Sequence, residues 1–173
     1  MTLEEDTEIL LQQKFFRFKK MKYLIFIQSR MNSKRFPGKA LAKIKNKVLI
    51  KHVYDRLVSF GKEKIVVLTS INKTDDIIAE FCKKNKINFF RGSLNNVYKR
   101  FVDATIYYKC EAFIRITGDS ILIDKKIIKM IISKFKTNKY DIVTNTLRKT
   151  FPIGLSVEMI KSNKFCQNKS KIK

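Results

Sequence analysis

The 173-residue chain has few of the residues that build zinc sites and disulfide frameworks. It contains one histidine and three cysteines, and Cys82, Cys110 and Cys166 are widely separated. Such sites need cysteines in pairs or in close spacing with histidines. The sequence therefore argues against both, and it predicts a protein of the reducing cytoplasm with Cys82 as a small core residue.

Long apolar runs and a secretory signal are also lacking. No run of about 18 apolar residues occurs, so we expect no membrane-spanning helix and no membrane partner. Residues 1–20 do not show the charged-then-apolar order of a secretory signal. Two interpretations of this N-terminal extension stay open: a short amphipathic helix, or an extension upstream of a natural start at Met21.

Acidic residues are scarce, and the chain carries a net charge of +23. This excess makes nucleic acid or an anionic membrane surface a candidate partner. However, 30 of the 38 basic residues are lysines scattered through the chain, whereas base readout and phosphate recognition favour arginine. We therefore favour a general compositional bias and keep a basic nucleic-acid-binding domain as the least favoured alternative.

Short apolar runs alternate with amphipathic segments along residues 21–161. Strands are expected at 23–27, 65–68, 87–90, 112–116, 140–145 and 155–160, and helices at 50–58, 74–82, 97–108 and 124–135. Crossovers of about ten or more residues predict an α/β fold, a mostly parallel sheet flanked by helices in three layers. Asp124 is expected to cap the last helix. Residues 162–173 form a Lys/Asn-rich segment that is expected to be a frayed or disordered tail.

The loop at residues 28–39, directly after the first strand, concentrates polar and cationic side chains. Arg30, Arg35 and Lys39 carry positive charge, and Ser29 adds a hydroxyl. The carboxyl ends of parallel strands are where ligands bind in open α/β sheets. The loop therefore predicts a site for a polyanion, with a solvated basic turn as the alternative.

Other candidate site residues fall at the same predicted edge of the sheet. Thr69 and Ser70 follow the second strand, and Asp119 follows the fourth. Arg100 lies on the early turns of a helix, where it could reach the ligand or remain a solvated charge. Four of the five glycines and both prolines also lie in the loops near strand ends, which indicates that backbone geometry matters there.

These same stretches resemble the cytidylyltransferase family. The similarity is closest to the branch named for spore coat polysaccharide biosynthesis protein F, which is related to the synthetases that join CMP to sialic acid and to 3-deoxy-manno-octulosonate. It covers about residues 21–161, in the order of the family's motifs. The matching stretches are residues 28–41, 91–93, 115–119, 122–124 and 151–158.

The resemblance implies a Rossmann-like nucleotide-diphospho-sugar transferase fold at residues 21–161 and transfer of CMP from CTP to a sugar during surface polysaccharide synthesis. A homodimer and a cytoplasmic location are also expected. Lys39, Arg30 and Asp119 match catalytic positions, with Asp119 as the Mg²⁺ ligand. The expected nucleotide-binding set is Ser29, Arg30, Arg35, Lys39, Thr69, Ser70 and Arg100.

The chain departs from the family pattern at two positions. Ile121 stands where the family usually has proline, and Ser156 stands where it usually has aspartate. Glu158 is the candidate for a second metal ligand. Family members usually continue into a further segment with another acidic metal ligand, so the resemblance implies a C-terminally truncated chain. A truncated nucleotide-sugar-binding relative, weakly active or without turnover, therefore remains the main alternative to an active enzyme.

Overall fold

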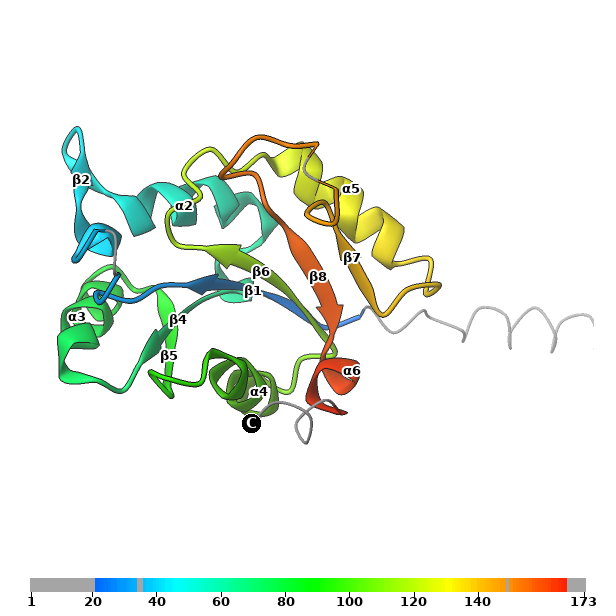
Figure 1. Ribbon diagram of the computed structural model, residues 1–173, viewed down its shortest axis with the longest axis horizontal. Helices are drawn as coiled ribbons and strands as arrows, with labels where there is room; N and C mark the ends of the chain where they lie inside the picture. The colour runs from blue at the N-terminus through cyan, green and yellow to red at the C-terminus, as the bar shows by residue number, and fades with distance from the viewer. Residues whose placement is uncertain (1–20, 34–35, 149, 168–173) are drawn as a thin grey trace, which may run out of the picture.

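A computed structural model describes residues 21–33, 36–148 and 150–167, and its centre is a six-stranded sheet (Figure 1). The spatial order of the strands is β5-β4-β1-β6-β8-β7. Their bounds are β1 Tyr23–Gln28, β4 Ile65–Ser70, β5 Asn88–Gly92, β6 Ala112–Thr117, β7 Ile142–Thr144 and β8 Glu158–Lys161. All six predicted strands are therefore present, with ends that differ by a few residues.

The sheet is mostly parallel, as predicted. Strands β5, β4, β1 and β6 pair in parallel, whereas β8 runs antiparallel to both β6 and β7. The last strand in sequence thus lies between two strands that precede it. The carboxyl ends of the four parallel strands share one edge, and this edge carries the loops that the sequence singles out.

Helices cover both faces of the sheet and complete three layers. Helices α2 (Leu49–Leu57), α3 (Asp76–Lys84) and α5 (Lys125–Phe135) pack on one face. Helices α4 (Val97–Tyr108) and α6 (Ser162–Gln167) pack on the other. Four short 3₁₀ helices connect these elements: η1 Lys39–Leu41, η2 Val58–Phe60, η3 Lys62–Lys64 and η4 Lys73–Asp75.

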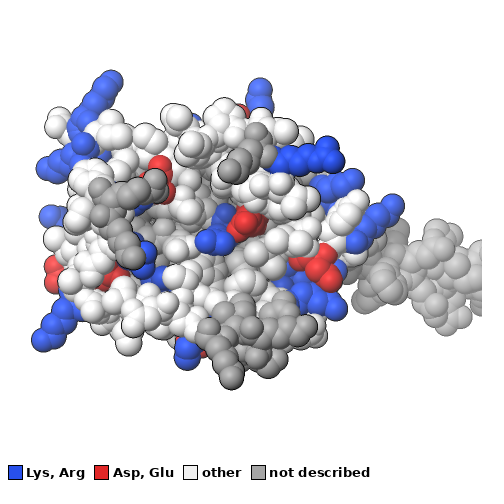
Figure 2. Space-filling model, viewed as in Figure 1, with Lys and Arg blue, Asp and Glu red and all other residues white. Residues whose placement is uncertain are grey.

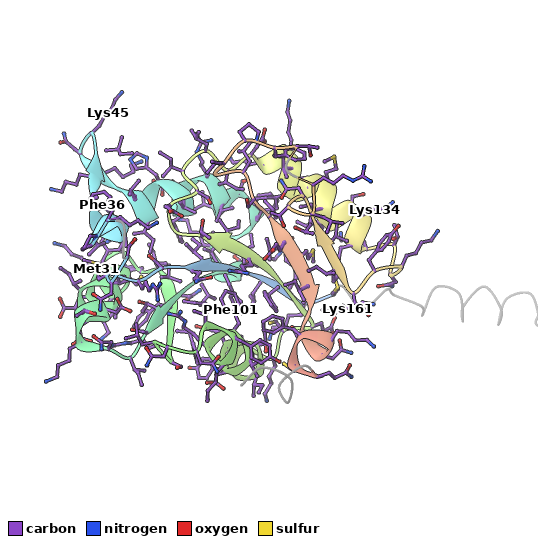
Figure 3. The ribbon with its side chains drawn as sticks, viewed as in Figure 1. Met31, Phe36, Lys45, Phe101, Lys134 and Lys161 are labelled. Carbon is purple, nitrogen blue, oxygen red and sulfur yellow. The ribbon has the colours of Figure 1, made fainter. Side chains whose placement is uncertain are left out.

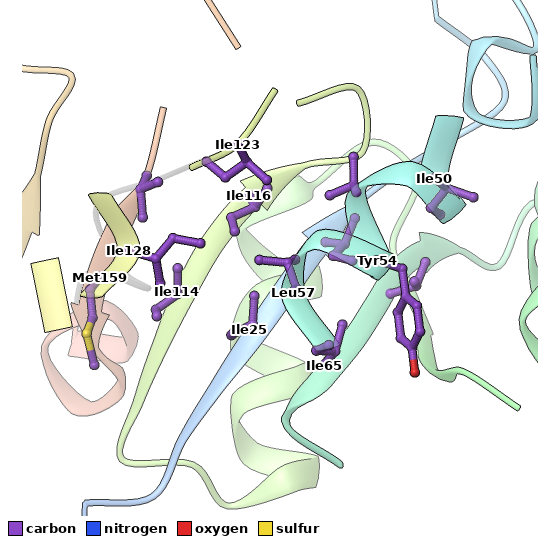
Figure 4. Packing of buried hydrophobic residues seen from close by; sticks show 14 of the residues in the cluster. Ile25, Ile50, Tyr54, Leu57, Ile65, Ile114, Ile116, Ile123, Ile128 and Met159 are labelled. Carbon is purple, nitrogen blue, oxygen red and sulfur yellow. The ribbon is translucent and has the colours of Figure 1, made fainter. Parts of the chain in front are cut away.

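The central strand β1 is buried on both faces because parallel sheets are covered on both sides. Ile25 and Ile27 belong to the larger core, where Leu57 of α2 and Ile128 of α5 also lie (Figure 4). Successive strand residues point to opposite faces, so Phe26 belongs to the second core. That core is aromatic: Phe26, Phe101 and Phe113 have ring centroids 5.4–5.9 Å apart.

Two elements were not predicted. A small hairpin, β2 (Lys43–Ile44) and β3 (Lys47–Val48), turns at Lys45, which has a φ of 47° and lies at the hairpin tip in Figure 3. The prediction of an unstructured tail is wrong for Ser162–Gln167, which form α6. Phe165 anchors this helix against Phe113, with ring centroids 5.1 Å apart, so tertiary packing overrides the polar local sequence. Residues 1–20 and 168–173 lie outside the described residues.

No helix among the described residues is both long and apolar enough to cross a bilayer. Cys82 is fully buried in the larger core, as predicted, and Asp124 caps α5 by accepting a hydrogen bond of 2.7 Å from the Lys126 amide. On the face shown in Figure 2, basic side chains project at several separate places. This distribution fits a general lysine bias.

Candidate functional site

A cleft of about 370 Å³ lies at the carboxyl ends of β1 and β6. This volume is in the range of small-ligand sites. Three stretches form it: the end of β1 with its loop, the start of η1, and the turn after β6. The lining residues are Gln28, Ser29, Arg30, Ser33, Lys39, Ala40, Thr117, Gly118 and Asp119.

Lys39 and Asp119 meet in this cleft although 80 residues separate them in the sequence. The Lys39 ammonium donates a hydrogen bond to the Asp119 carboxylate and forms an ion pair with it. Gly38 directs Lys39 into the cleft: it has a φ of 76°, and its amide donates a hydrogen bond of 2.8 Å to the Met31 carbonyl. A left-handed backbone at this position favours glycine.

The turn that carries Asp119 is held close to the end of β1. The Gly118 amide donates a hydrogen bond of 2.8 Å to the Gln28 carbonyl. A β-carbon on Gly118 would lie 2.9 Å from Ser29 Oγ and 3.1 Å from the Gln28 carbonyl oxygen. Glycine is therefore required here because the two backbones approach too closely for a side chain.

The electrostatics of the cleft stabilise the carboxylate form of Asp119. Partial burial raises the pKa of Asp119, but the hydrogen bonds from Lys39 and Thr117 and the charge of Lys39 lower it by more. The net pKa lies below the ordinary value of 3.8. The cleft thus holds a carboxylate beside a cation, with Arg30 exposed next to them.

The predicted residues at the end of β4 lie behind the cleft wall. Thr69 and Ser70 are fully buried and are not among the lining residues. Ser70 donates hydrogen bonds from its amide and hydroxyl to Asp75. Within the described residues, the Thr69 hydroxyl has no hydrogen-bond partner.

Arg100 is also buried, so its interpretation as a solvated helix charge is wrong. Its side chain is 0% exposed, and its three guanidinium nitrogens have no hydrogen-bond partner in the described part of the chain. Burial lowers the pKa of Arg100; the charge of Asp75 raises it, and that of Arg30 lowers it. Gly92 makes room for this side chain, since a β-carbon there would lie 2.9 Å from Arg100 Cγ.

The structure does not bring Glu158 into the cleft beside Asp119. Glu158 pairs with Arg115 across β6 and β8, and its Oε2 lies 3.1 Å from Arg115 NH1. Arg115 Nε also donates to Gln28 Oε1 at 3.3 Å. Glu158 is absent from the cleft lining, and no cluster of three or more potential metal-ligating side chains (His, Cys, Asp or Glu) occurs in the described ranges. Arg35 lies outside the described residues.

Three residues of the site were not among the expected site residues. Gln28 and Thr117 line the cleft and belong to stretches that the sequence singles out. The third is Asp75: Asn72 caps η4, while the Asp75 side chain makes no cap hydrogen bond. Its carboxylate instead bonds Ser70 and the Met31 amide, contacts that no local sequence pattern reveals.

Known proteins resemble this chain in sequence. The family profile described as cytidylyltransferase matches residues 24–171. The spore coat polysaccharide biosynthesis protein SpsF of Bacillus subtilis is 30% identical over 147 residues, which cover 81% of this chain and 59% of SpsF. The chain spans about half the length of the curated relatives it matches, at 48–59% for the first three.

Solved structures agree with this similarity. A cytidylyltransferase from Leptospira borgpetersenii serovar Hardjo-bovis superposes with a TM-score of 0.83 at 33% identity, covering 88% of this chain and 66% of that protein. CMP:2-keto-3-deoxy-manno-octonic acid synthetase, solved with CTP, shares the fold with a TM-score of 0.66 at 17% identity, covering 88% of this chain and 78% of that one. With this fold, and with the profile matching most of its length, the chain belongs to the cytidylyltransferase family.

Proposed function

We propose that this domain transfers CMP from CTP to a sugar in the cytoplasm, as a step in the synthesis of a surface polysaccharide. The observation that carries the proposal is the meeting of Lys39 and Asp119 in a cleft that Arg30 and Ser29 also line. Support also comes from family membership and from the CTP bound in a protein of the same fold.

In this reaction a sugar hydroxyl oxygen bonds to the α-phosphorus of CTP. The bond from that phosphorus to the bridging oxygen breaks, pyrophosphate leaves, and the hydroxyl proton passes to solvent. Negative charge grows on the leaving pyrophosphate and must be stabilised. Arg30 and Lys39 supply positive charge at the cleft, while the Ser29 hydroxyl is available to a phosphate oxygen.

The donor set at the cleft fits a magnesium ion that CTP brings with it. Magnesium is usually held by one or two carboxylates together with substrate phosphate oxygens. Asp119 is a carboxylate at the cleft, its side chain is 40% exposed, and its lowered pKa favours the ionised form. When bound there, the metal would neutralise phosphate charge. Lys39, which pairs with Asp119, would supply positive charge to the triphosphate.

The test is pyrophosphate release from CTP across a panel of acidic and neutral sugars. Asp119→Asn should abolish release while the protein remains folded at the assay temperature. Asp103→Asn is the matched control, because Asp103 is a carboxylate on α4 that pairs with Lys99 and does not line the cleft. Equal loss in both variants would contradict the assigned role of Asp119.

Calorimetry with CTP separates the proposal from its alternatives. Binding of CTP with no product from any sugar would favour the binding protein without turnover, which the single carboxylate in the cleft also supports. Absence of CTP binding, together with tight and steeply salt-dependent binding to random DNA, would favour the nucleic-acid alternative.

A further inference from the structure

Asp75 links two loops at the edge of the sheet through a completely buried carboxylate. Its side chain is 0% exposed. Oδ1 accepts a hydrogen bond of 2.7 Å from the Met31 amide. Oδ2 accepts one of 3.0 Å from the Ser70 amide and another from the Ser70 hydroxyl. One side chain therefore holds the loop after β1 against the end of β4.

The backbone that Asp75 holds lies between the two cations of the cleft. Met31 directly follows Arg30, and its carbonyl accepts hydrogen bonds from the amides of Ser33 (2.9 Å) and Gly38 (2.8 Å). Gly38 in turn precedes Lys39. In Figure 3 the Met31 label marks this loop beside the end of β1. The Met31 residue is thus held at its amide by Asp75 and at its carbonyl by the loop itself.

Arg100 is also completely buried, but its guanidinium nitrogens have no hydrogen-bond partner in the described part of the chain. No hydrogen bond therefore joins it to Asp75 there. The contacts that hold the Asp75 carboxylate are those of the two amides and the Ser70 hydroxyl.

We infer that Asp75 is a positioning residue, which fixes the Met31 backbone so that Arg30 faces the triphosphate. The part that concerns the triphosphate rests on the proposed function. An aspartate accepts hydrogen bonds from two backbone amides, those of Met31 and Ser70, at its two oxygens. An asparagine would replace one of these oxygens with an NH₂ group, which cannot accept a hydrogen bond from an amide.

Amide hydrogen exchange by NMR tests the positioning directly and without a ligand. In Asp75→Asn the exchange rate of the Met31 amide should rise roughly tenfold or more, as expected for a lost hydrogen bond to a charged group. Asp76→Asn is the matched control one residue away, where the carboxylate is half exposed and pairs with Arg91. An unchanged Met31 rate in Asp75→Asn, or an equal rise in both variants, would overturn the inference.

Binding of inorganic tripolyphosphate tests the consequence for the cleft. Asp75→Asn should weaken its affinity roughly tenfold, whereas Asp75→Asn added to Arg30→Ala should weaken it no further, because coupled residues are not additive. Additive losses would mean that Asp75 merely supports the fold. If Asp75→Asn does not fold, Ser70→Ala removes the hydroxyl that donates to Asp75 and accepts from the Asn72 amide, while both amide bonds to Asp75 stay in place. Faster Met31 exchange in that variant supports the inference, while an unchanged rate opposes it.

The two proposals fail in different ways. Wild-type protein that binds tripolyphosphate but releases no pyrophosphate from CTP would contradict the enzymatic function and leave the positioning role intact. Full activity with unaltered tripolyphosphate affinity in Asp75→Asn would contradict the positioning role alone.

Discussion

At the ends of β1 and β6, Lys39 and Asp119 meet with 28% and 40% of their side chains exposed, whereas near the ends of β4 and β5 Asp75 and Arg100 are completely buried. Both regions lie along the same edge of one sheet, and each contains charges of both signs. The exposed pair can exchange its partner for a ligand, because water already reaches it. The buried residues cannot do so without a large desolvation cost, so they are suited to holding backbone in place.

Lys39→Ala should produce the largest effect. Removing this cation from the cleft is expected to lower kcat/KM for pyrophosphate release on the order of 100-fold, the size seen when one transition-state donor is lost. Lys43→Ala on the exposed β2 strand is the control, and it should retain full activity. If Lys39→Ala were as active as the control, the exposed cation would have no role in the reaction, and the proposed contrast with the buried charges would be wrong.

Gly118→Ala should have the next largest effect, and that effect is on the stability of the fold. The added methyl group would meet Ser29 Oγ and the Gln28 carbonyl at 2.9 and 3.1 Å, so the turn must shift. We expect the free energy of unfolding to fall by about 1–3 kcal/mol, measured by urea denaturation. Gly92→Ala should cost a similar amount by displacing Arg100, while only Gly118→Ala should also weaken CTP binding at the cleft. If both variants were as stable as the wild type, the close contacts expected for a β-carbon at Gly118 and at Gly92 would be contradicted.

Ser70→Ala and Thr69→Val compare two neighbouring buried hydroxyls. The Ser70 hydroxyl bonds Asp75, so its loss should cost about 1–2 kcal/mol of unfolding free energy. The Thr69 hydroxyl has no partner in the described part of the chain, so Thr69→Val should be neutral or stabilising by up to about 1 kcal/mol. A clear destabilisation by Thr69→Val would reveal a partner for that hydroxyl.

The smallest effect should be the pH dependence that Asp119 contributes. Its folded pKa is below the ordinary value of 3.8, so the carboxylate stabilises the fold above that pH. The contribution is lost as the pH falls through the lowered folded pKa. The melting temperatures of the wild type and Asp119→Asn should therefore differ near pH 7 and converge under acid, as measured by thermal unfolding. If the difference in melting temperature widened on acidification, the sign assigned to the contribution of Asp119 to stability would be wrong.

The sequence predicts the strands and the meeting of Lys39 with Asp119 for the same physical reason. Buried parallel strands are continuous apolar runs, and their carboxyl ends share an edge, so loops far apart in the chain converge there. The antiparallel direction of β8 could not be predicted in this way. The described residues between β7 and β8 form no helix, and only pairing in space shows that β8 inserts beside β6.

The positions of Glu158 and Asp75 also depend on tertiary structure. The cross-strand register places Glu158 opposite Arg115, and the sequence of neither strand alone determines that register. Asp75 sits in a Thr-Asp-Asp run that is typical of a helix start, and a contact 44 residues away decides its role. Local patterns therefore identify cleft residues on strand ends better than the residues that support them.

The hydrogen bonds of the Met31 carbonyl close the loop after β1. Because the Gly38 amide donates to this carbonyl, the chain comes back beside Met31 directly before Lys39. Arg30 and Lys39 therefore flank one shared backbone anchor at Met31. A change that loosens this anchor is expected to displace both cations at once.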